Sequence, residues 1–190
     1  MNTTEVLTDE ILAERLRTDT QFLGEIIERY ETKLTLFIRR KSSASIDDAK
    51  DILQNVFIKV YKNINDFDTT LTFSSWIYRI TRNEMIDWYR KEKRKPHVSL
   101  EGSEMMLETI ASESNVAESV AKAHSAEDIK ALIETLPDKY REIVLLRYFE
   151  DKSYDEIADI LTLPPGTVAV RLNRVKTLLR DTLRHYENRE

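Results

Sequence analysis

The most informative stretch of this chain is Ser153-Tyr-Asp-Glu-Ile-Ala-Asp-Ile-Leu-Thr-Leu-Pro-Pro-Gly-Thr-Val-Ala-Val-Arg-Leu-Asn-Arg-Val-Lys-Thr-Leu-Leu-Arg180. Ser153 and Glu156 have the spacing of a capping box, which predicts that a helix begins here. Pro164 and Pro165 predict the end of that helix, because proline lacks a backbone N–H and restricts the residue before it. We expect a second helix to begin after Gly166. Two short helices joined by a tight turn are typical of a helix-turn-helix.

The second predicted helix has an apolar face and a polar face. Residues at intervals of three and four form the apolar face, namely Val168, Leu172, Val175 and Leu179. The opposite face carries Asn173, Arg174, Thr177 and Arg180. A helix that packs on one side and presents cations on the other suits the phosphate backbone of DNA. We therefore expect this helix to enter a DNA groove.

The composition predicts a helical protein without disulfide bonds. Hydrophobic residues make up 41% and charged residues 33% of the 190 positions, and only 3 Gly and 4 Pro are present. These values favour helices joined by short turns. With 0 Cys, the chain has no disulfide, thiol nucleophile or cysteine zinc site. Neither an apolar run of about 18 residues nor a secretory signal is visible, which agrees with a cytoplasmic protein.

Charge is unevenly distributed along the chain, although the net charge is −5. One basic cluster comprises Arg79, Arg82, Arg90, Lys91, Lys93, Arg94 and Lys95, and a second comprises Arg171, Arg174, Lys176, Arg180 and Arg184. Between them lies an acidic segment with Glu101, Glu104, Glu108, Glu113 and Glu118. Local fields matter more than the total, so the two basic clusters are candidate nucleic-acid surfaces.

The hydrophobic pattern predicts an all-α protein with two small domains. Helices are expected over residues 8–42, 47–64 and 73–95 in a first domain, residues 1–97. A Ser- and Glu-rich acidic linker follows at 98–127, and a four-helix module with the helix-turn-helix occupies 128–190. The Ser- and Glu-rich composition of residues 98–127 favours a tether over a packed domain.

Three motifs, in the same order along the chain, resemble bacterial RNA polymerase sigma factors. Leu136-Pro-Asp-Lys-Tyr-Arg-Glu-Ile-Val-Leu-Leu-Arg-Tyr148 and the helix-turn-helix resemble region four of that family. Asp48-Ala-Lys-Asp-Ile-Leu-Gln-Asn-Val-Phe57 resembles the polymerase-binding segment of region two. Phe73-Ser-Ser-Trp-Ile-Tyr-Arg-Ile-Thr-Arg-Asn83 resembles its DNA-contacting helix. The short architecture is similar to the extracytoplasmic-function (ECF) branch.

The resemblance implies a dissociable initiation factor and not an enzyme. Its expected partners are the two largest subunits of core RNA polymerase, promoter DNA and an anti-sigma factor, and it is expected to be monomeric on the polymerase. The linker would thread toward the active-centre and RNA-exit channels. No cofactor or metal is expected, since His97, His124 and His185 are scattered and no phosphate loop, nucleophile motif or catalytic carboxylate pair is visible.

The resemblance also assigns expected contacts in the first domain. The polymerase contact falls on Asp51, Gln54, Asn55 and Ile58, where the family usually has Glu in place of Asn55. The minus-ten contact falls on a polar loop and on the basic helix after it, at Asp68, Thr69, Thr70, Arg79, Arg82, Asn83, Arg90 and Lys91. Short polar side chains suit a base turned out of the stack, and the cations suit phosphates. From its position on the apolar stripe, Trp76 is expected in the core.

The expected minus-thirty-five contacts in the second domain are Thr167, Val170, Arg171, Asn173, Arg174, Lys176 and Arg180. Arg171, Lys176 and Arg180 suit phosphates, whereas Thr167, Asn173 and Arg174 suit base edges. Relatives commonly have Lys or Arg followed by Ser where this chain has Ala169-Val170. Apolar side chains there can touch thymine methyls but donate no hydrogen bond to purines.

Other functions remain open at the level of sequence. A self-sufficient helix-turn-helix regulator that binds duplex DNA as a dimer would explain residues 128–190 but leaves residues 48–57 and 79–95 without a role. An adaptor that only resembles a sigma factor would be separated from the first hypothesis by transcription with core polymerase. An enzyme of nucleic-acid metabolism lacks a visible catalytic constellation.

Overall fold

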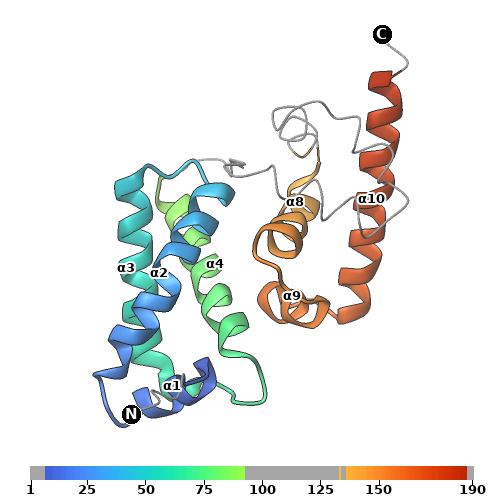
Figure 1. Cartoon of the computed structure of the whole chain (residues 1–190). Coiled ribbons are helices and arrows are strands. Elements are labelled where there is room, and N and C mark those ends of the chain that lie inside the picture. The colour runs from blue at the N-terminus through green and yellow to red at the C-terminus, as the bar shows by residue number, and fades with distance from the viewer. Residues whose placement is uncertain (1–6, 93–132, 134–135, 188–190) are drawn as a thin grey trace, which may run out of the picture. The chain divides into compact units, whose positions relative to one another are not determined.

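In the computed structural model, residues 7–92, 133 and 136–187 are described, and every regular element within them is helical (Figure 1). The elements, in chain order, are α1 (Asp9–Leu16), α2 (Phe22–Lys41), α3 (Ile46–Asn63), the 3₁₀ turn η1 (Ile64–Asp66), α4 (Phe73–Glu92), α8 (Asp138–Val144), the π-helical segment η2 (Leu145–Phe149), α9 (Tyr154–Leu161) and α10 (Pro165–Glu187). The predicted all-α class is confirmed.

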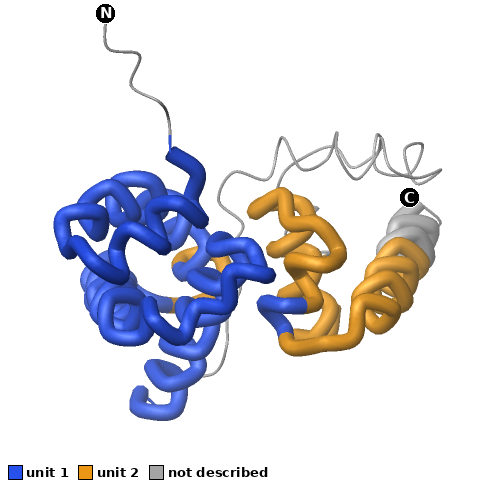
Figure 2. The backbone as a smooth tube through the Cα atoms, turned by 90° about the horizontal axis from the view of Figure 1, so that it is seen from below, with its two compact units in different colours: residues 1–38, 44–95, 159–161 blue, residues 39–43, 96–158, 162–190 orange. Residues whose placement is uncertain are grey.

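The chain divides into two compact units (Figure 2). One comprises residues 1–38, 44–95 and 159–161, and the other comprises residues 39–43, 96–158 and 162–190. The predicted linker and both of its boundaries, at residues 97 and 128, lie outside the described residues. The exact division into domains therefore stays a prediction.

In the first unit, α2, α3 and α4 run alongside one another, and α1 lies across one end of them (Figure 1). Their apolar faces meet in a core that includes the edge-to-face pair of Phe37 and Tyr78, with ring centroids 5.2 Å apart. Trp76 is buried, as predicted. Ile80 is half-buried, and Tyr78 is fully buried. Helix α4 packs against both α1 and α3.

The single helix predicted over residues 8–42 is wrong, because the structure has α1 and α2 with a turn between them. The Asp19 side chain accepts a hydrogen bond from the backbone N–H of Gln21 at 3.0 Å, and Thr18 bonds back to the carbonyl of Arg15. Such local bonds compete with helix geometry. The apolar period runs through the break because both helices bury one face in the same core.

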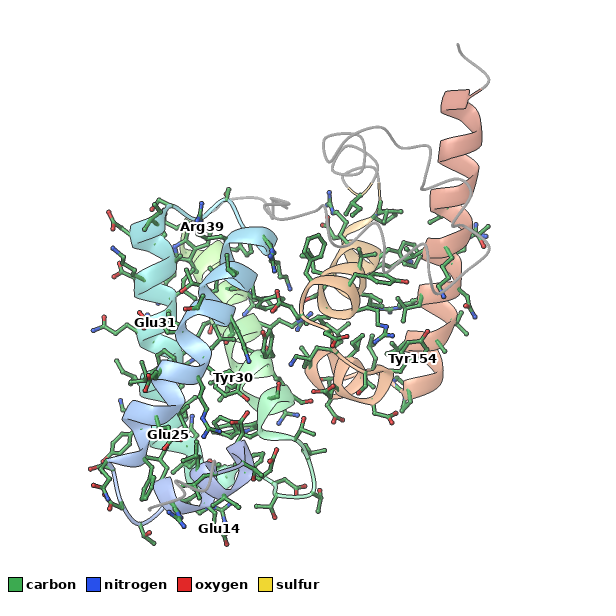
Figure 3. All side chains as sticks on the ribbon, in the orientation of Figure 1. Glu14, Glu25, Tyr30, Glu31, Arg39 and Tyr154 are labelled. Carbon is green, nitrogen blue, oxygen red and sulfur yellow. The ribbon has the colours of Figure 1, made fainter. Side chains whose placement is uncertain are left out.

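A partly buried polar cluster joins α1 to α2. Asp9 accepts a bond from Arg29 at 2.7 Å on one oxygen and from the Tyr30 hydroxyl at 2.5 Å on the other. Arg29 also pairs with Glu25 and donates to the Leu7 carbonyl. Figure 3 shows Glu25 and Tyr30 along the part of α2 nearer to α1. Burial and the Asp9 carboxylate raise the pKa of the Tyr30 hydroxyl well above its ordinary value.

Replacing Tyr30 with phenylalanine is expected to lower the free energy of unfolding by about 1–2 kcal/mol at pH 7, because Asp9 loses a charge-assisted bond. Above a pH of about 10, where tyrosine in the unfolded chain ionises, the native hydroxyl of Tyr30 keeps its proton. The difference in unfolding free energy between wild type and Tyr30→Phe should therefore shrink progressively as the pH rises above that point. Urea denaturation of both proteins between pH 7 and 11 measures the difference, and a difference that grows with pH would contradict the assignment.

In the second unit, the predicted capping box at the start of α9 is present. The backbone N–H of Ser153 donates to Glu156 at 2.9 Å, and the Ser153 hydroxyl accepts from the Glu156 N–H at 3.2 Å. Before it, Arg147 donates to the Lys152 carbonyl and lies over the Tyr154 ring. These contacts fix where α9 begins.

The turn between α9 and α10 is closed by backbone bonds. Helix α9 ends at Leu161, and Thr162 adopts a left-handed conformation with φ of 55°. The Leu163 N–H then reaches back to the Ala158 carbonyl at 2.9 Å, which is the long bond of a Schellman motif. The second helix begins at Pro165, so the prediction that it starts after Gly166 is wrong. Proline suits a first helical position, where the missing N–H has no intrahelical partner.

Candidate functional site

The four predicted polymerase contacts lie on one face of α3. Ser45 and Asp48 form a capping box at the start of this helix, which sets its rotation. The other side of the helix, with Leu53, Phe57 and Val60, is buried in the core. The positions i, i+3, i+4 and i+7 bring together Asp51, Gln54, Asn55 and Ile58, all exposed. We call these four residues the α3 stripe.

One exposed aromatic residue extends the α3 stripe and was missed by the sequence reasoning. Tyr61 follows Ile58 by three positions, and the two side chains are 46% and 43% exposed. Exposed large apolar side chains at this spacing form one contiguous surface on a helix. Aromatic residues are enriched in protein interfaces. The spacing from Ile58 was the signal that could have identified Tyr61.

The polar loop between η1 and α4 is held at both ends by buried aromatic side chains. Phe67 and Phe73 are buried, with ring centroids 5.5 Å apart, and Phe67 lies 5.3 Å from the Trp76 ring. Thr72 caps α4, because its hydroxyl accepts a bond from the Ser75 N–H at 3.2 Å. Asp68, Thr69 and Thr70 are left exposed between these anchors. We call residues 67–72 the anchored loop.

Within the anchored loop, Asp68 has a structural partner. One of its carboxylate oxygens accepts from the Thr70 backbone N–H at 2.9 Å and from the Thr70 hydroxyl at 2.7 Å. These two bonds lower the pKa of Asp68, which is ionised at neutral pH. Asp68 and Thr70 thus shape the loop, and Thr69 stands exposed at its tip.

The basic residues of α4 differ in their surroundings. Arg79, Arg82, Asn83 and Arg90 lie on one face of the helix, whereas Lys91 lies about 100° around the axis from Arg90. Asn83, Arg90 and Lys91 are exposed, and Arg79 and Arg82 are half-buried. Desolvation lowers the pKa of Arg82, but arginine remains charged at neutral pH. A partly dehydrated cation loses less hydration when it meets a phosphate.

In α10, Val168, Leu172 and Val175 are buried, as predicted. Val170 is 69% exposed, and Asn173 and Arg174 are exposed as well. Thr167, Arg171 and Lys176 are half-buried. From the helical period, Arg171 and Lys176 flank the buried face on its two sides, whereas Val170, Asn173 and Arg174 share the opposite face and Thr167 lies at its edge. The side chain of Arg180 lies outside the described residues.

Within the described ranges, no group of three or more His, Cys, Asp or Glu side chains is arranged to hold a metal ion. No helix in that part of the chain is both long and apolar enough to cross a lipid bilayer.

Two family models match this chain over two separate ranges. Residues 26–95 match the model described as Sigma-70 region 2, and residues 126–179 match Sigma-70, region 4. The α3 stripe, the anchored loop and the basic residues of α4 fall in the first range, and the helix-turn-helix falls in the second. Helix α1 lies outside both.

The chain is also similar to curated proteins over most of its length. It is 34% identical over 171 residues to the ECF RNA polymerase sigma factor SigW of Bacillus subtilis, covering 87% of this chain and 91% of that protein. It is 29% identical over 178 residues to the ECF RNA polymerase sigma-E factor of Escherichia coli K12, covering 90% and 92%.

Two solved structures have a similar fold. CnrH, in complex with the cytosolic domain of CnrY, superposes with a TM-score of 0.63 at 24% identity, covering 93% of this chain and 97% of that chain. The sigma factor RpoE, in complex with the anti-sigma factor NepR from Bartonella quintana, superposes with a TM-score of 0.59 at 19% identity, covering 85% and 96%.

Proposed function

Because this chain belongs to the ECF branch of the sigma-70 family and directs RNA polymerase to promoters, we propose how its residues divide that task. The α3 stripe binds core polymerase. The anchored loop and the basic face of α4 bind and help to open the minus-ten element. The outward face of α10 reads the minus-thirty-five element.

For the polymerase contact, the support is an exposed surface with mixed chemistry on a rigid helix. The α3 stripe offers a carboxylate, two amides and an apolar side chain without disturbing the core on the other face. Interfaces commonly combine such an apolar centre with a polar rim. In this chain Asn55 supplies an amide in place of a carboxylate, so Asp51 carries the charge of the α3 stripe.

For the minus-ten contact, the support is the combination of a fixed loop and nearby cations. Thr69 and the backbone of the anchored loop can bond the edge of an unstacked base, and the buried side chains of Phe67 and Phe73 anchor the two ends of the loop. Arg79, Arg82, Asn83, Arg90 and Lys91 then bind the phosphates of the opened strand.

For the minus-thirty-five contact, residues of α10 take two roles. Thr167, Val170, Asn173 and Arg174 contact base edges in the major groove. Arg171, Lys176 and Arg180 contact phosphates, which fix the register of the helix on the duplex.

The partners proposed for this chain follow from that division. It binds the two largest subunits of core polymerase and acts as a monomer on it, in the cytoplasm where transcription takes place. An anti-sigma factor would block these surfaces, and the similarity to RpoE in complex with NepR supports a partner of that kind.

The observation that carries the proposal is that the α3 stripe, the polar residues of the anchored loop and the outward residues of α10 (Val170, Asn173 and Arg174) are exposed, while α3 and α10 bury their other faces. Run-off transcription tests it with purified core polymerase and a promoter identified by sequencing transcripts after overexpression. We expect a specific transcript only when both proteins are present. Tight binding of the promoter duplex by the purified protein alone would instead favour the self-sufficient regulator.

Val170 is expected to contact the methyl group of one thymine in the minus-thirty-five element. Burying one methyl-sized group is worth about 0.8 kcal/mol, or roughly a fourfold change in affinity. Replacing that thymine with deoxyuridine should weaken holoenzyme binding by about this factor, and Val170→Ala should weaken binding and remove the sensitivity to the methyl group. The measurement is a competition assay with each thymine replaced in turn. Equal methyl sensitivity in wild type and Val170→Ala at every position would refute the contact.

A further inference from the structure

Helix α1, together with Arg17 that caps its C-terminus, contacts both ends of the anchored loop. At the first end, the Arg17 guanidinium donates to the carbonyl of Phe67 at 2.7 Å and to that of Ile64 at 3.4 Å. At the second end, a carboxylate oxygen of Glu10 accepts a hydrogen bond from the Phe73 N–H at 3.3 Å. These partners are 47, 50 and 63 positions away in the sequence.

The charges of these two residues match the backbone groups they meet. Arg17 reaches carbonyls after the end of α3, where a cation is favoured by the partial negative charge of a helix C-terminus. Glu10 reaches the N–H of Phe73, the first residue of α4, where an anion is favoured. One short helix thus bonds to the end of one helix and to the start of the next, with the anchored loop between them.

Helix α1 is itself firmly held. Leu12, Ala13 and Leu16 are buried, and α1 packs against α4. Asp9 at its start is bonded to Arg29 and Tyr30 of α2. The positions of Arg17 and Glu10 are therefore fixed by the core, and they can fix the ends of the loop in turn.

We propose that α1 positions the anchored loop for minus-ten recognition, with Arg17 and Glu10 setting the separation and orientation of its two ends. This inference rests on the proposed function and extends it to a helix outside both matched ranges. Arg17 and Glu10 are positioning residues, because they bond to the backbone of the loop and leave Asp68–Thr70 facing outward.

The test measures two discrimination ratios. Each is transcription from the unchanged promoter divided by transcription from a promoter with a single-base change, in the minus-ten element for one ratio and in the minus-thirty-five element for the other. Arg17→Met keeps the apolar stem but removes the donors, and Arg17→Lys restores a charged donor. We expect Arg17→Met to reduce discrimination against minus-ten changes about five- to tenfold while discrimination against minus-thirty-five changes stays constant. Arg17→Lys should recover part of the loss. The matched control is Arg15→Met, on the same helix but stacked on Phe22, which should change neither ratio.

The two ratios separate positioning from simple destabilisation. A less stable protein transcribes less from every promoter and leaves both ratios unchanged, and that result with Arg17→Met would overturn the inference. Glu10→Ala provides a second variant at the other end of the loop, and an unchanged minus-ten ratio there would count against the inference too. If wild-type holoenzyme shows no discrimination at the minus-ten element, the proposed function itself fails, which is a distinguishable outcome.

Discussion

Ile58→Asp is expected to weaken binding to core polymerase about 30-fold or more without unfolding the protein. A buried apolar contact at the centre of an interface is worth about 2 kcal/mol, which corresponds to this factor. A carboxylate in its place would add the penalty of burying an unpaired charge. Because Ile58 is already 43% exposed in the α3 stripe, the free energy of unfolding should change by only about 0.5 kcal/mol.

The chain offers a matched control for this substitution. Ile11, on α1, is 40% exposed, so Ile11→Asp introduces the same charge at a similar degree of burial on another surface. Both variants are titrated against core polymerase and assayed for transcription. Ile58→Asp should fail in both assays, whereas Ile11→Asp should bind core with wild-type affinity. Equal core affinities for the two variants would contradict the assignment of the α3 stripe.

The second large effect is expected at Phe73. This side chain is fully buried, and its ring packs against Tyr30, Phe67 and Trp76 with centroid distances of 5.7, 5.5 and 5.7 Å. Phe73→Ala removes a large side chain from the point where α2, the anchored loop and α4 meet. Such truncations cost about 3–5 kcal/mol, from lost transfer energy and the cavity left behind. We expect minus-ten opening to be lost with the stability of this unit.

The native fluorophores make this measurement specific. The chain has 2 Trp, at positions 76 and 88, and both lie in α4. Urea denaturation followed by tryptophan fluorescence therefore reports on the first unit. Phe22→Ala is the control. Because Phe22 is only half-buried, this substitution should lower the free energy of unfolding by about 1 kcal/mol. If Phe73→Ala lowers the free energy of unfolding no more than Phe22→Ala does, the aromatic cluster contributes little to stability.

Most of the fold could be predicted because local signals and burial agree. The capping box of Ser153 and Glu156 was predicted from spacing, and the two bonds are present. The four residues of the α3 stripe were named from the family resemblance, and they are exposed on one face of a helix whose other face is buried. Where a terminal signal and an amphipathic pattern coincide, sequence is sufficient to place an element.

The errors arose where a competing local interaction or a distant contact decided the outcome. The turn between α1 and α2 was missed because the apolar period continues across it, while Asp19 bonds to the backbone of the turn. The start of α10 was placed too late because proline was interpreted only as a helix breaker, although it suits a first turn. The bonds of Arg17 to the carbonyls near the anchored loop join residues far apart in sequence, so no local pattern could reveal them.

The roles of the site residues were also less predictable than their positions. The family resemblance marked Asp68 and Thr70 as polar loop residues that could meet a base, but their side chains bond to each other. The same residue types would have fitted either role, because a short polar side chain can hydrogen-bond its own loop as readily as a ligand.

The turn before α10 has a consequence for how promoter preference can diverge. The reach of Leu163 back to Ala158 is made by main-chain atoms, and Pro165 begins the helix with a φ angle preset by its ring. These are main-chain and proline-ring features, and the described side chains of Val170, Asn173 and Arg174 are exposed away from the buried face. Exchanging Val170, Asn173 or Arg174 should therefore retarget the protein to other promoters at a stability cost of about 0.5 kcal/mol or less. New promoter specificities can therefore be selected through the outward residues of α10 while the fold stays unchanged.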